Sequence, residues 1–366
     1  MSREVDLSKV IKNINSLCED IPMGSVNIME VCGTHTNAIA KLGLRGVLHD
    51  KIKLISGPGC PVCVTPENYI DAAIELSRQG IIILTFGDLM RVKGENSTLL
   101  LEKSKGRDVR IIYSVYDVIK VAEENKDREI VFLGVGFETT APLIAAVIKS
   151  SKEKQLKNLS FLISLKIMFP IINKILEDKA NIQGIICPGN VAVITGDSNF
   201  RFIYDNYKIP AVICGFEDKD IISGIYFLIN HIEASTKSQV GDGFENLYVR
   251  YVKSEGNKKA KELIREIFKI NYSVWRGIGL IDKSGLEIKI EHSELDAIKK
   301  FKLQKFFDYK KIEYPLKGGC LCDQIILGKA SPDTCKLFGK ECTPRAPYGP
   351  CMISSEGACA AYYRYR

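Results

Sequence analysis

The cysteines of this sequence are the residues whose type and spacing most directly imply chemistry. The chain of 366 residues carries 12 of them, and six lie close together near the C-terminus: Cys320, Cys322, Cys335, Cys342, Cys351 and Cys359. The first residues contain no apolar signal segment, so we expect a reducing, cytoplasmic compartment. There, cysteines serve as metal ligands or redox thiols more often than as structural disulfides. The C-terminal group therefore predicts a metal site.

The spacing of these six cysteines distinguishes between kinds of metal site. One choice of four ligands has the pattern C-x14-C-x6-C-x16-C: Cys320, Cys335, Cys342 and Cys359. Soft thiolates select zinc or an iron–sulfur cluster, and structural zinc usually shows paired C-x2-C or C-x4-C motifs. Wide and uneven spacing is more typical of a cluster held by loops. We therefore expect a cluster, with zinc or uncoordinated thiols as the alternatives. Cys322 could replace Cys320, and Cys351 is interpreted as a packing cysteine.

Two cysteines are predicted at the start of a helix. Cys32 opens the motif CGTHT after a strand ending at Val31, and Cys359 follows two serines that could cap a helix near Glu356. The positive end of a helix lowers the pKa of a thiol. Cys32 is then a nucleophile or a soft metal ligand, and His35 a base, second ligand or hydrogen-bond donor. The alternative is that Cys32 is a buried apolar residue and that His35 caps the helix.

Three further turns follow predicted strands. In GPGCPVC, Cys60 and Cys63 form a C-x-x-C pair that could be a redox dithiol, a shared metal site or a structural element. In GFETTAP, backbone amides could face an anion, and Glu138 could handle a proton or a partner amine. The turn after Cys187 is similar in composition. For the last two turns, ordinary turn chemistry is the alternative. No P-loop, radical-SAM C-x3-C-x2-C, G-x-S-x-G or H-E-x-x-H motif occurs.

The elements that must position these residues alternate between strand and helix. Short β-branched runs predict strands at Val26–Val31, Ile52–Ile55, Ile81–Leu84, Val109–Tyr113, Ile130–Leu133, Ser160–Leu165, Ile185–Cys187 and Ala211–Cys214. Helices are expected between them, at Pro66–Arg78, Val115–Glu124 and Ala141–Lys152. Such alternation predicts an α/β fold with parallel sheets. We expect two similar α/β domains, residues 1–125 and 126–235.

Residues 236–366 differ from the preceding residues in composition and periodicity. They are expected to form a smaller, irregular C-terminal domain that binds the cluster. A strand is predicted at Leu247–Tyr251, a helix at Lys258–Lys269 and a hairpin at Gly277–Ile288. The region after Lys317 is rich in Gly, Pro and Cys and offers few core positions. A metal is a common way to stabilise such a region.

Composition excludes several classes of function. Hydrophobic residues make up 46% and charged residues 26%, as in globular proteins, and no apolar run is long enough to span a membrane. The net charge of +7 is scattered, so we expect no nucleic-acid role. The densest basic run, residues 299–311, is explained by a solvated helix face or by docking of an acidic protein.

Five motifs in this order resemble the HypD family of [NiFe]-hydrogenase maturation factors: CGTHT, GPGCPVC, GFETTAP, PGNVAVITG and SSEGACAAYYRY. The resemblance runs from about Cys32 to the C-terminus. It implies a cytoplasmic scaffold that, with a HypC-type chaperone, holds one ferrous iron while cyanide and carbon monoxide are added. Cyanide would come through a transient HypE partner, with HypF supplying the carbamoyl precursor. The Fe(CN)2CO unit would then pass to the hydrogenase, and a [4Fe–4S] cluster is implied in the C-terminal region.

The resemblance also implies roles for individual residues. Cys32 matches the iron-site cysteine, to be joined by a cysteine of the HypC-type chaperone, and His35 would support the iron or its diatomic ligands. Cys60 and Cys63 match a redox-active pair close to the iron being assembled. The implied cluster ligands are Cys320, Cys335, Cys342 and Cys359. We hypothesise an electron relay from the cluster through the pair to the iron. Two alternatives to the scaffold function are a freestanding iron–sulfur thiol–disulfide oxidoreductase and a protein-interaction module stabilised by a structural zinc ion.

Overall fold

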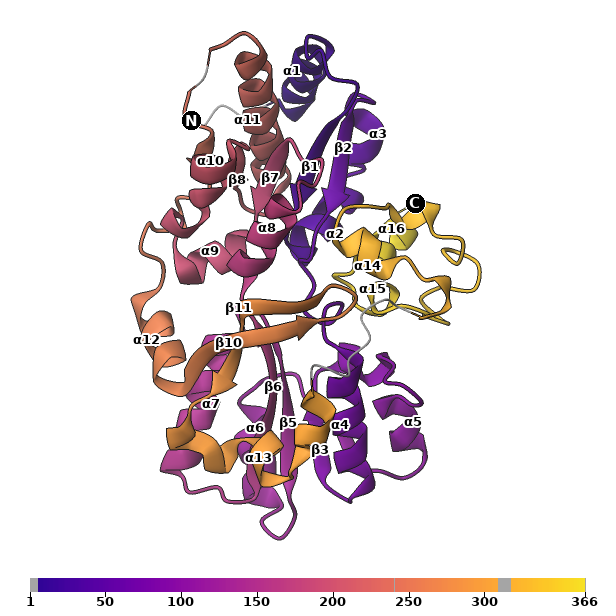
Figure 1. Ribbon diagram of the computed structural model, residues 1–366, viewed down its shortest axis with the longest axis vertical. Helices are drawn as coiled ribbons and strands as arrows, with labels where there is room; N and C mark the ends of the chain where they lie inside the picture. Colours follow the sequence, from indigo (N-terminus) through magenta and orange to yellow (C-terminus); the bar gives the residue numbers. More distant parts are fainter. Residues whose placement is uncertain (1–5, 240, 309–316, 366) are drawn as a thin grey trace. The chain divides into compact units, whose positions relative to one another are not determined.

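The computed structural model describes residues 6–239, 241–308 and 317–365 (Figure 1). The chain forms two compact units, each built from separate segments. The first contains Met1–Cys60, Ile172–Asn257 and Gly319–Arg366, and the second contains Pro61–Ile171 and Lys258–Gly318. The chain therefore passes from the first unit to the second between Cys60 and Pro61, inside the GPGCPVC motif.

The first unit is built on a five-stranded parallel sheet in the order β2-β1-β7-β8-β9. Its strands are β1 (Val26–Glu30), β2 (Ile52–Ser56), β7 (Gly184–Cys187), β8 (Ala211–Ile213) and β9 (Phe244–Asn246). Its longer helices are α1 (Leu7–Glu19), α2 (Gly33–Lys41), α9 (Gly189–Thr195), α10 (Phe202–Tyr207) and α11 (Asp218–Thr236), with the short α3 (Leu44–Val47). Strands β7 and β8 are buried throughout, because helices cover parallel strands on both faces.

The second unit is built on a six-stranded mixed sheet in the order β10-β11-β6-β5-β3-β4. Its parallel strands are β3 (Ile82–Thr85), β4 (Val109–Ile111), β5 (Ile130–Gly136) and β6 (Leu159–Lys166), and the antiparallel hairpin is β10 (Phe268–Trp275) and β11 (Gly279–Ile288). Its helices include α4 (Glu67–Arg78), α5 (Leu99–Ser104), α6 (Asp117–Glu124), α7 (Ala141–Glu153), α12 (Lys258–Ile267) and α13 (Ala297–Lys300). Helix α8 (Met168–Glu177) crosses from the second unit to the first.

The sheet of the first unit has a point where the direction of winding reverses. The chain leaves β1 for β2 on one side, whereas β7, β8 and β9 follow one another on the other side. Ligands of open α/β sheets bind outside the carboxyl ends of the strands at such a point. The carboxyl end of β1 carries Cys32, and that of β7 carries the turn after Cys187.

The C-terminal segment belongs to the first unit and has little regular structure. It contains α14 (Cys322–Ile326), α15 (Pro350–Ile353) and α16 (Ala358–Arg364), and α16 packs beside α2 (Figure 1). The guanidinium of Arg45 lies 4.3 Å from the centre of the Tyr362 ring, and Asn37 Nδ2 donates to the Ser355 carbonyl at 2.9 Å. The cysteine-rich segment is thereby fixed against the helix that follows Cys32.

The predicted α/β class with mainly parallel sheets is confirmed, and the eight predicted strands of the first 214 residues match β1–β8 closely. The compact units do not follow the three consecutive domains that were expected, 1–125, 126–235 and 236–366. Strand β7 pairs with β1 although five strands lie between them in the sequence, and the order of elements does not reveal such pairing. Residues 236–366 are likewise divided between the units.

Two local predictions after residue 236 are wrong. The strand expected at Leu247–Tyr251 is instead β9, which ends at Asn246, because Asn246 Oδ1 accepts from the Tyr248 amide at 3.0 Å and turns the chain. The helix expected to reach Lys269 ends at Ile267, and Phe268–Trp275 forms a strand. The basic run around residue 300 falls on α13 and a short 3-10 helix, Leu303–Phe307; residues 309–311 lie outside the described residues. Within the described residues, no helix has the length and apolar character to cross a bilayer.

Candidate metal and redox centre

Cys32 lies at the carboxyl end of β1, directly before α2, as the sequence predicted. Its amide donates to Glu30 Oε2 at 3.0 Å, and Thr36 Oγ1 donates to Glu30 Oε1. Glu30 is buried, with 1% of its surface exposed, and burial raises its pKa to about 7. A single buried carboxyl group therefore holds both Cys32 and the first turn of α2.

Two glycines allow other segments to approach Cys32 closely. A Cβ on Gly59 would lie 2.4 Å from the Cys32 nitrogen, and a Cβ on Gly33 would lie 2.4 Å from Cβ of Glu356. The Gly33 amide also donates to the Gly59 carbonyl at 3.1 Å. The GPGCPVC loop and the C-terminal segment therefore both pack against the CGTHT motif, so three motifs that are distant in sequence meet around one thiol.

The pKa of Cys32 is raised to about 12, which corrects the expectation that the helix end would lower it. Burial is the largest cause, and the negative charges of Glu30 and Glu356 add to it; the amides of His35 and Thr34 only partly offset it. A buried thiol with such a pKa is a poor free nucleophile. A divalent metal ion can displace its proton, and nearby carboxylates favour a cation. The geometry thus suits a metal ligand better than a nucleophile.

His35 is fully buried and faces the loop after β8. Its Nε2 lies 2.9 Å from the Gly215 carbonyl and 3.7 Å from Cys214 Sγ, and its ring lies 4.6 Å from that of Phe216. Its Nδ1 is buried, with no hydrogen-bond partner in the described part of the chain. The sequence interpretation missed Cys214 and Phe216, although both belong to the end of a predicted strand and the turn after it, at this edge of the sheet.

Replacing Glu30 by alanine is expected to expose Cys32 to reagents. The change leaves the buried Cys32 amide without an acceptor and leaves the Thr36 hydroxyl only its longer contact with the Cys32 carbonyl, at 3.3 Å, at a cost of about 2 kcal/mol. Glu30→Gln keeps an acceptor of the same length and serves as the matched control. Iodoacetamide labelling of native protein, quantified on the Cys32 peptide, should be faster for Glu30→Ala than for Glu30→Gln. Equal rates in the two variants would contradict this role.

Cys60 and Cys63 are joined by a disulfide, and both are buried, with exposed fractions of 5% and 1%. The sequence predicted that this pair could be redox-active. Gly59, the residue directly before Cys60, packs against Cys32. The first cysteine of the disulfide is therefore the next residue after a contact of the candidate metal ligand.

All six C-terminal cysteines line one small cavity, together with Ile325, Phe338, Gly349 and Met352. Among the described residues the lining contains no carboxylate and no imidazole, so the donors there are soft sulfur atoms, the set that iron–sulfur clusters use. A Cβ on Gly349 would lie 2.7 Å from Cys320 Sγ, and the Tyr348 amide donates to Cys342 Sγ at 3.3 Å. These residues therefore fit a cluster. In the described residues, no group of three or more His, Cys, Asp or Glu side chains is arranged to hold a single metal ion.

The six cysteines differ in their burial. Cys322 and Cys351 each expose 1% of their surface, whereas Cys335, Cys342 and Cys359 expose 5–7% and Cys320 is partly exposed. Cys359 lies in the first turn of α16 as expected, but Gly357 rather than a serine precedes this helix. Burial raises the pKa of Cys359 well above its ordinary value, contrary to the expected effect of the helix end.

Glu138 follows β5 in the second unit and is 5% exposed. Its Oε1 accepts from the Met168 amide at 2.8 Å, while its Oε2 is buried with no partner among the described residues. Burial raises the pKa of Glu138 to about 7. The preceding Phe137 stacks on Trp275 with ring centres 6.0 Å apart.

A buried lysine near this point was missed by the sequence interpretation. Lys166 ends β6 and donates to Ser273 Oγ at 2.8 Å and to the Val274 carbonyl at 2.7 Å. Burial lowers its pKa to about 7. Its position at the end of the apolar run FLISLK was the available signal, because a charge there must find partners inside the protein.

The raised pKa of Glu138 predicts a pH-dependent stability. Below about pH 4.5 the carboxyl is protonated in both folded and unfolded chains; between 4.5 and 7 only the unfolded chain ionises, so stability is lost as the pH rises. The full loss is on the order of 3 kcal/mol. We expect the thermal midpoint of the unchanged protein to fall, relative to that of Glu138→Gln, between pH 5 and pH 8. Parallel midpoint curves for the two proteins would refute the assignment.

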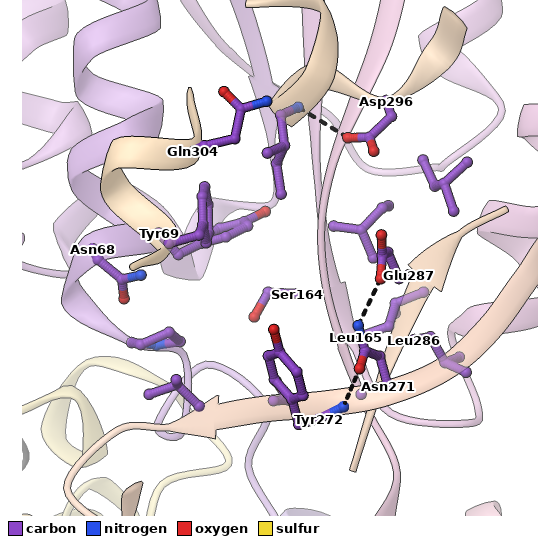
Figure 2. A pocket seen from close by; sticks show the side chains of 18 of the residues that line it. Asn68, Tyr69, Ser164, Leu165, Asn271, Tyr272, Leu286, Glu287, Asp296 and Gln304 are labelled. Atoms are coloured by element: carbon purple, nitrogen blue, oxygen red, sulfur yellow. Dashed lines mark hydrogen bonds between the residues drawn. The ribbon is translucent and has the colours of Figure 1, made fainter. Parts of the chain in front are cut away.

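The second unit contains a cavity of about 320 Å³ lined in part by residues of β6, β10 and β11, and Figure 2 shows it from close by. Asn68 and Tyr69 of α4 face it from one side, and Asn271, Glu287 and Asp296 from the other (Figure 2). None of the site residues predicted from the sequence lines this cavity. We assign no function to this cavity.

Comparison with known proteins gives a consistent result. The sequence model of the HypD family, described as "Hydrogenase formation hypA family", matches residues 6–366. A putative hydrogenase expression/formation protein of Methanocaldococcus jannaschii is 38% identical over 360 residues, covering 98% of this chain and 97% of that protein. The hydrogenase maturation factor HypD of Escherichia coli is 39% identical over 346 residues, covering 93% and 89%. HypD2 of Bradyrhizobium diazoefficiens is 39% identical over 354 residues, covering 94% and 90%.

Proposed function

Because this chain belongs to the HypD family and is a hydrogenase maturation factor, we propose that Cys32 holds the iron on which the hydrogenase cofactor is assembled. The cargo would be ferrous iron that acquires cyanide and carbon monoxide ligands, as the Fe(CN)2CO unit. A HypC-type chaperone would supply a second thiolate, and a HypE-type protein would deliver cyanide transiently.

The burial of Cys32 and its charged neighbours are the observations that support this proposal. The thiol is buried beside Glu30 and Glu356, so its proton is retained until a cation replaces it. This environment protects the sulfur from oxidation and alkylation in the absence of iron. His35 is fixed to the loop after β8 by the Gly215 carbonyl and would support the iron site from that side. Carboxylates near the sulfur favour binding of a dication over a neutral electrophile.

We further propose that Cys320, Cys335, Cys342 and Cys359 bind a [4Fe–4S] cluster. Each thiolate of such a cluster binds a different iron atom, which requires sulfurs set around a larger group than one ion. The amide of Tyr348 donates to Cys342 Sγ, and amide donors to ligand sulfurs tune the cluster potential. Cys322 and Cys351 are the most deeply buried of the six and would pack behind the ligands. When bound, the cluster supplies single electrons.

The Cys60–Cys63 disulfide is proposed as the redox partner of this cluster. Its reduction takes two electrons and two protons and gives two thiols, and a cluster held by the four cysteines would be a source of single electrons for it. The two cysteines follow directly on Gly59, which packs against Cys32, so the dithiol would be formed in the loop next to the proposed iron ligand. Glu138 is proposed to hold a proton, because its free carboxyl oxygen is buried and its pKa is near neutrality.

The disulfide also raises the alternative of a freestanding thiol–disulfide oxidoreductase. That reaction needs direct attack of one sulfur on a substrate disulfide. Both cysteine residues are nearly inaccessible, with exposed fractions of 5% and 1%, which favours the scaffold over this alternative. An interaction module stabilised by zinc is disfavoured by the absence of paired C-x2-C spacing, whereas the all-thiol lining suits zinc and a cluster alike.

Infrared spectroscopy tests the scaffold proposal. The full chain would be purified with its HypC-type chaperone after expression with the other maturation proteins. Bands from bound cyanide and carbon monoxide are expected in the complex. Their absence, in cells that produce active hydrogenase, would contradict the iron-holding role.

A further inference from the structure

The sheet of the second unit also has a point where the direction of winding reverses. Strand β4 follows β3 on one side, whereas β5 and then β6 lie on the other side. Strands β3 and β5 are parallel neighbours, so they end at the same edge of the sheet. Ligands of open α/β sheets bind in the crevice outside the carboxyl ends of the strands at such a point.

A cavity of about 460 Å³ lies at this reversal point. It is lined by Phe86 and Gly87, which follow β3, by Val135 near the end of β5, and by Thr140 in the turn after β5. Small-molecule sites have volumes of roughly 300–1,000 Å³ and occur preferentially at such points. The strand order and the cavity therefore indicate the same place through two separate observations.

The side chains around this cavity are mainly apolar or aromatic. Tyr113 and Tyr116, in the turn after β4, expose 92% and 55% of their surface, and Leu143 of α7 exposes 45%. Exposed apolar side chains are common singly, whereas a group of them around one cavity is typical of a binding site. Phe86 is held by an edge-to-face contact with Phe132, with ring centres 5.7 Å apart. This lining suits a flat aromatic ring.

Hydrogen bonds fix the turn that carries the two tyrosines. The Ser114 amide donates to Asp117 Oδ2 at 3.0 Å, and the Asp117 amide donates to the Ser114 carbonyl at 3.1 Å. The Tyr116 amide donates to Ser114 Oγ at 3.3 Å. Just before the turn, the Ile112 amide donates to the Thr85 carbonyl at 2.9 Å. The turn is therefore ordered before a ligand binds, so little conformational entropy is lost on binding.

The charges around the cavity disfavour an anionic ligand. Among the described residues, its lining has one carboxylate, Asp88, and no lysine, arginine or histidine. The first turn of α7 offers few amides, because those of Thr140 and Ala141 both donate to the Phe137 carbonyl, at 3.0 and 3.2 Å, and Pro142 has none. A negative charge placed here would lie near a carboxylate without a basic partner. A ligand without negative charge is therefore favoured.

We propose that this cavity binds a flat aromatic molecule that carries no negative charge. Its ring would lie against Phe86 and Tyr116, and a polar edge of the ring would face the Thr140 hydroxyl. The cavity belongs to the second unit, whereas Cys32 and the C-terminal cysteines belong to the first. The inference therefore goes beyond the proposed iron role and does not depend on it.

Three probes with the same ring and different charge test this proposal. Indole is neutral, tryptamine is cationic and indole-3-acetate is anionic at neutral pH. Their dissociation constants for the full chain would be measured by saturation-transfer NMR titration. We expect indole and tryptamine to bind at least about tenfold more tightly than indole-3-acetate, because the carboxylate of the last probe finds no basic partner in the lining.

A variant that fills the cavity tests its location. A Cβ on Gly87 would meet only Ile111 Cγ2, at 3.9 Å, so Gly87→Leu adds a side chain to the open space that Gly87 lines. Gly46→Leu is the matched control, since an added Cβ there meets no atom within 4 Å and the residue lies in the first unit. We expect Gly87→Leu to weaken indole binding at least about tenfold and Gly46→Leu to change it less than about twofold. Thermal midpoints verify that both variants are folded.

Each outcome supports or overturns the proposal. Unchanged indole binding in Gly87→Leu, or equal loss in both variants, overturns the location. Equal or tighter binding of indole-3-acetate overturns the charge assignment. Failure of all three probes to bind at millimolar concentration overturns the small-molecule site. The infrared bands of the iron unit are a separate measurement, so each of these failures leaves the proposed role of Cys32 intact.

Discussion

Replacing Cys32 by serine is expected to abolish the cyanide and carbon monoxide infrared bands of the complex, with a loss of roughly 100-fold or more. Serine has nearly the same size and keeps the hydrogen bond that the backbone amide donates to Glu30 Oε2, but its oxygen is a harder and far more basic ligand than a thiolate. The burial that raises the pKa of the thiol would raise that of a hydroxyl further, so iron could not displace the proton.

The matched control for this variant is Cys18→Ser. Cys18 is a fully buried thiol on α1 of the same unit and packs in the apolar core. The control should lower stability and leave the infrared bands of the purified complex intact. Equal loss of bands in both variants would show that the effect comes from general destabilisation. Bands of normal intensity in the Cys32→Ser variant would remove Cys32 from the iron site.

Alanine substitution of the six C-terminal cysteines is expected to divide them into two groups. Loss of Cys335, Cys342 or Cys359 should reduce bound iron and acid-labile sulfide to about a tenth or less, because a missing ligand leaves one iron of the cluster open to solvent. Loss of Cys351 should leave the visible absorbance largely unchanged. The same samples should show a lower thermal midpoint wherever the cluster is lost, since metal binding contributes to the folding of this irregular segment.

The pair Cys320 and Cys322 gives the sharpest comparison within this series. Cys320 is partly exposed and contacts Gly349, whereas Cys322 is 1% exposed at the start of α14. We expect Cys320→Ala to lose the cluster and Cys322→Ala to keep it. The reverse pattern would move the fourth ligand to Cys322, and retention in both variants would mean that either sulfur can serve. Iron and sulfide analysis of anaerobically purified protein distinguishes the three results.

The local predictions from sequence were accurate where periodicity and turn chemistry act over a few residues. The strands around Ile28, Leu54 and Ile130 are apolar runs bounded by turn residues, and the structure has them within one to three residues of their predicted ends. The error at Leu247–Tyr251 has a similarly local cause. That run has the composition of a strand, but the side chain of Asn246 and the Arg250–Asp220 pair turn it into a loop.

The electrostatic predictions were less accurate than the positional ones. Cys32 and Cys359 both lie at helix starts as expected, yet the pKa of each thiol is raised rather than lowered. The effect of a helix end is limited to its first turn and is small compared with the cost of placing a charge in the interior. Burial depends on which distant segments cover a residue, and a single sequence does not reveal this.

The sequence alone determined the family, the α/β class, the location of Cys32 at the end of a strand and the concentration of soft ligands in the C-terminal segment. These are properties of residue type, spacing and short-range periodicity. The tertiary structure decided that β7 pairs with β1, that the cysteine-rich segment packs on Gly33, and that all six of its thiols line one cavity. The first two of these contacts join residues more than 150 positions apart, and they follow from which apolar surfaces are buried together rather than from any local pattern. The six cysteines therefore predicted a metal site, but only the fold shows that the segment carrying them packs against the helix that follows Cys32.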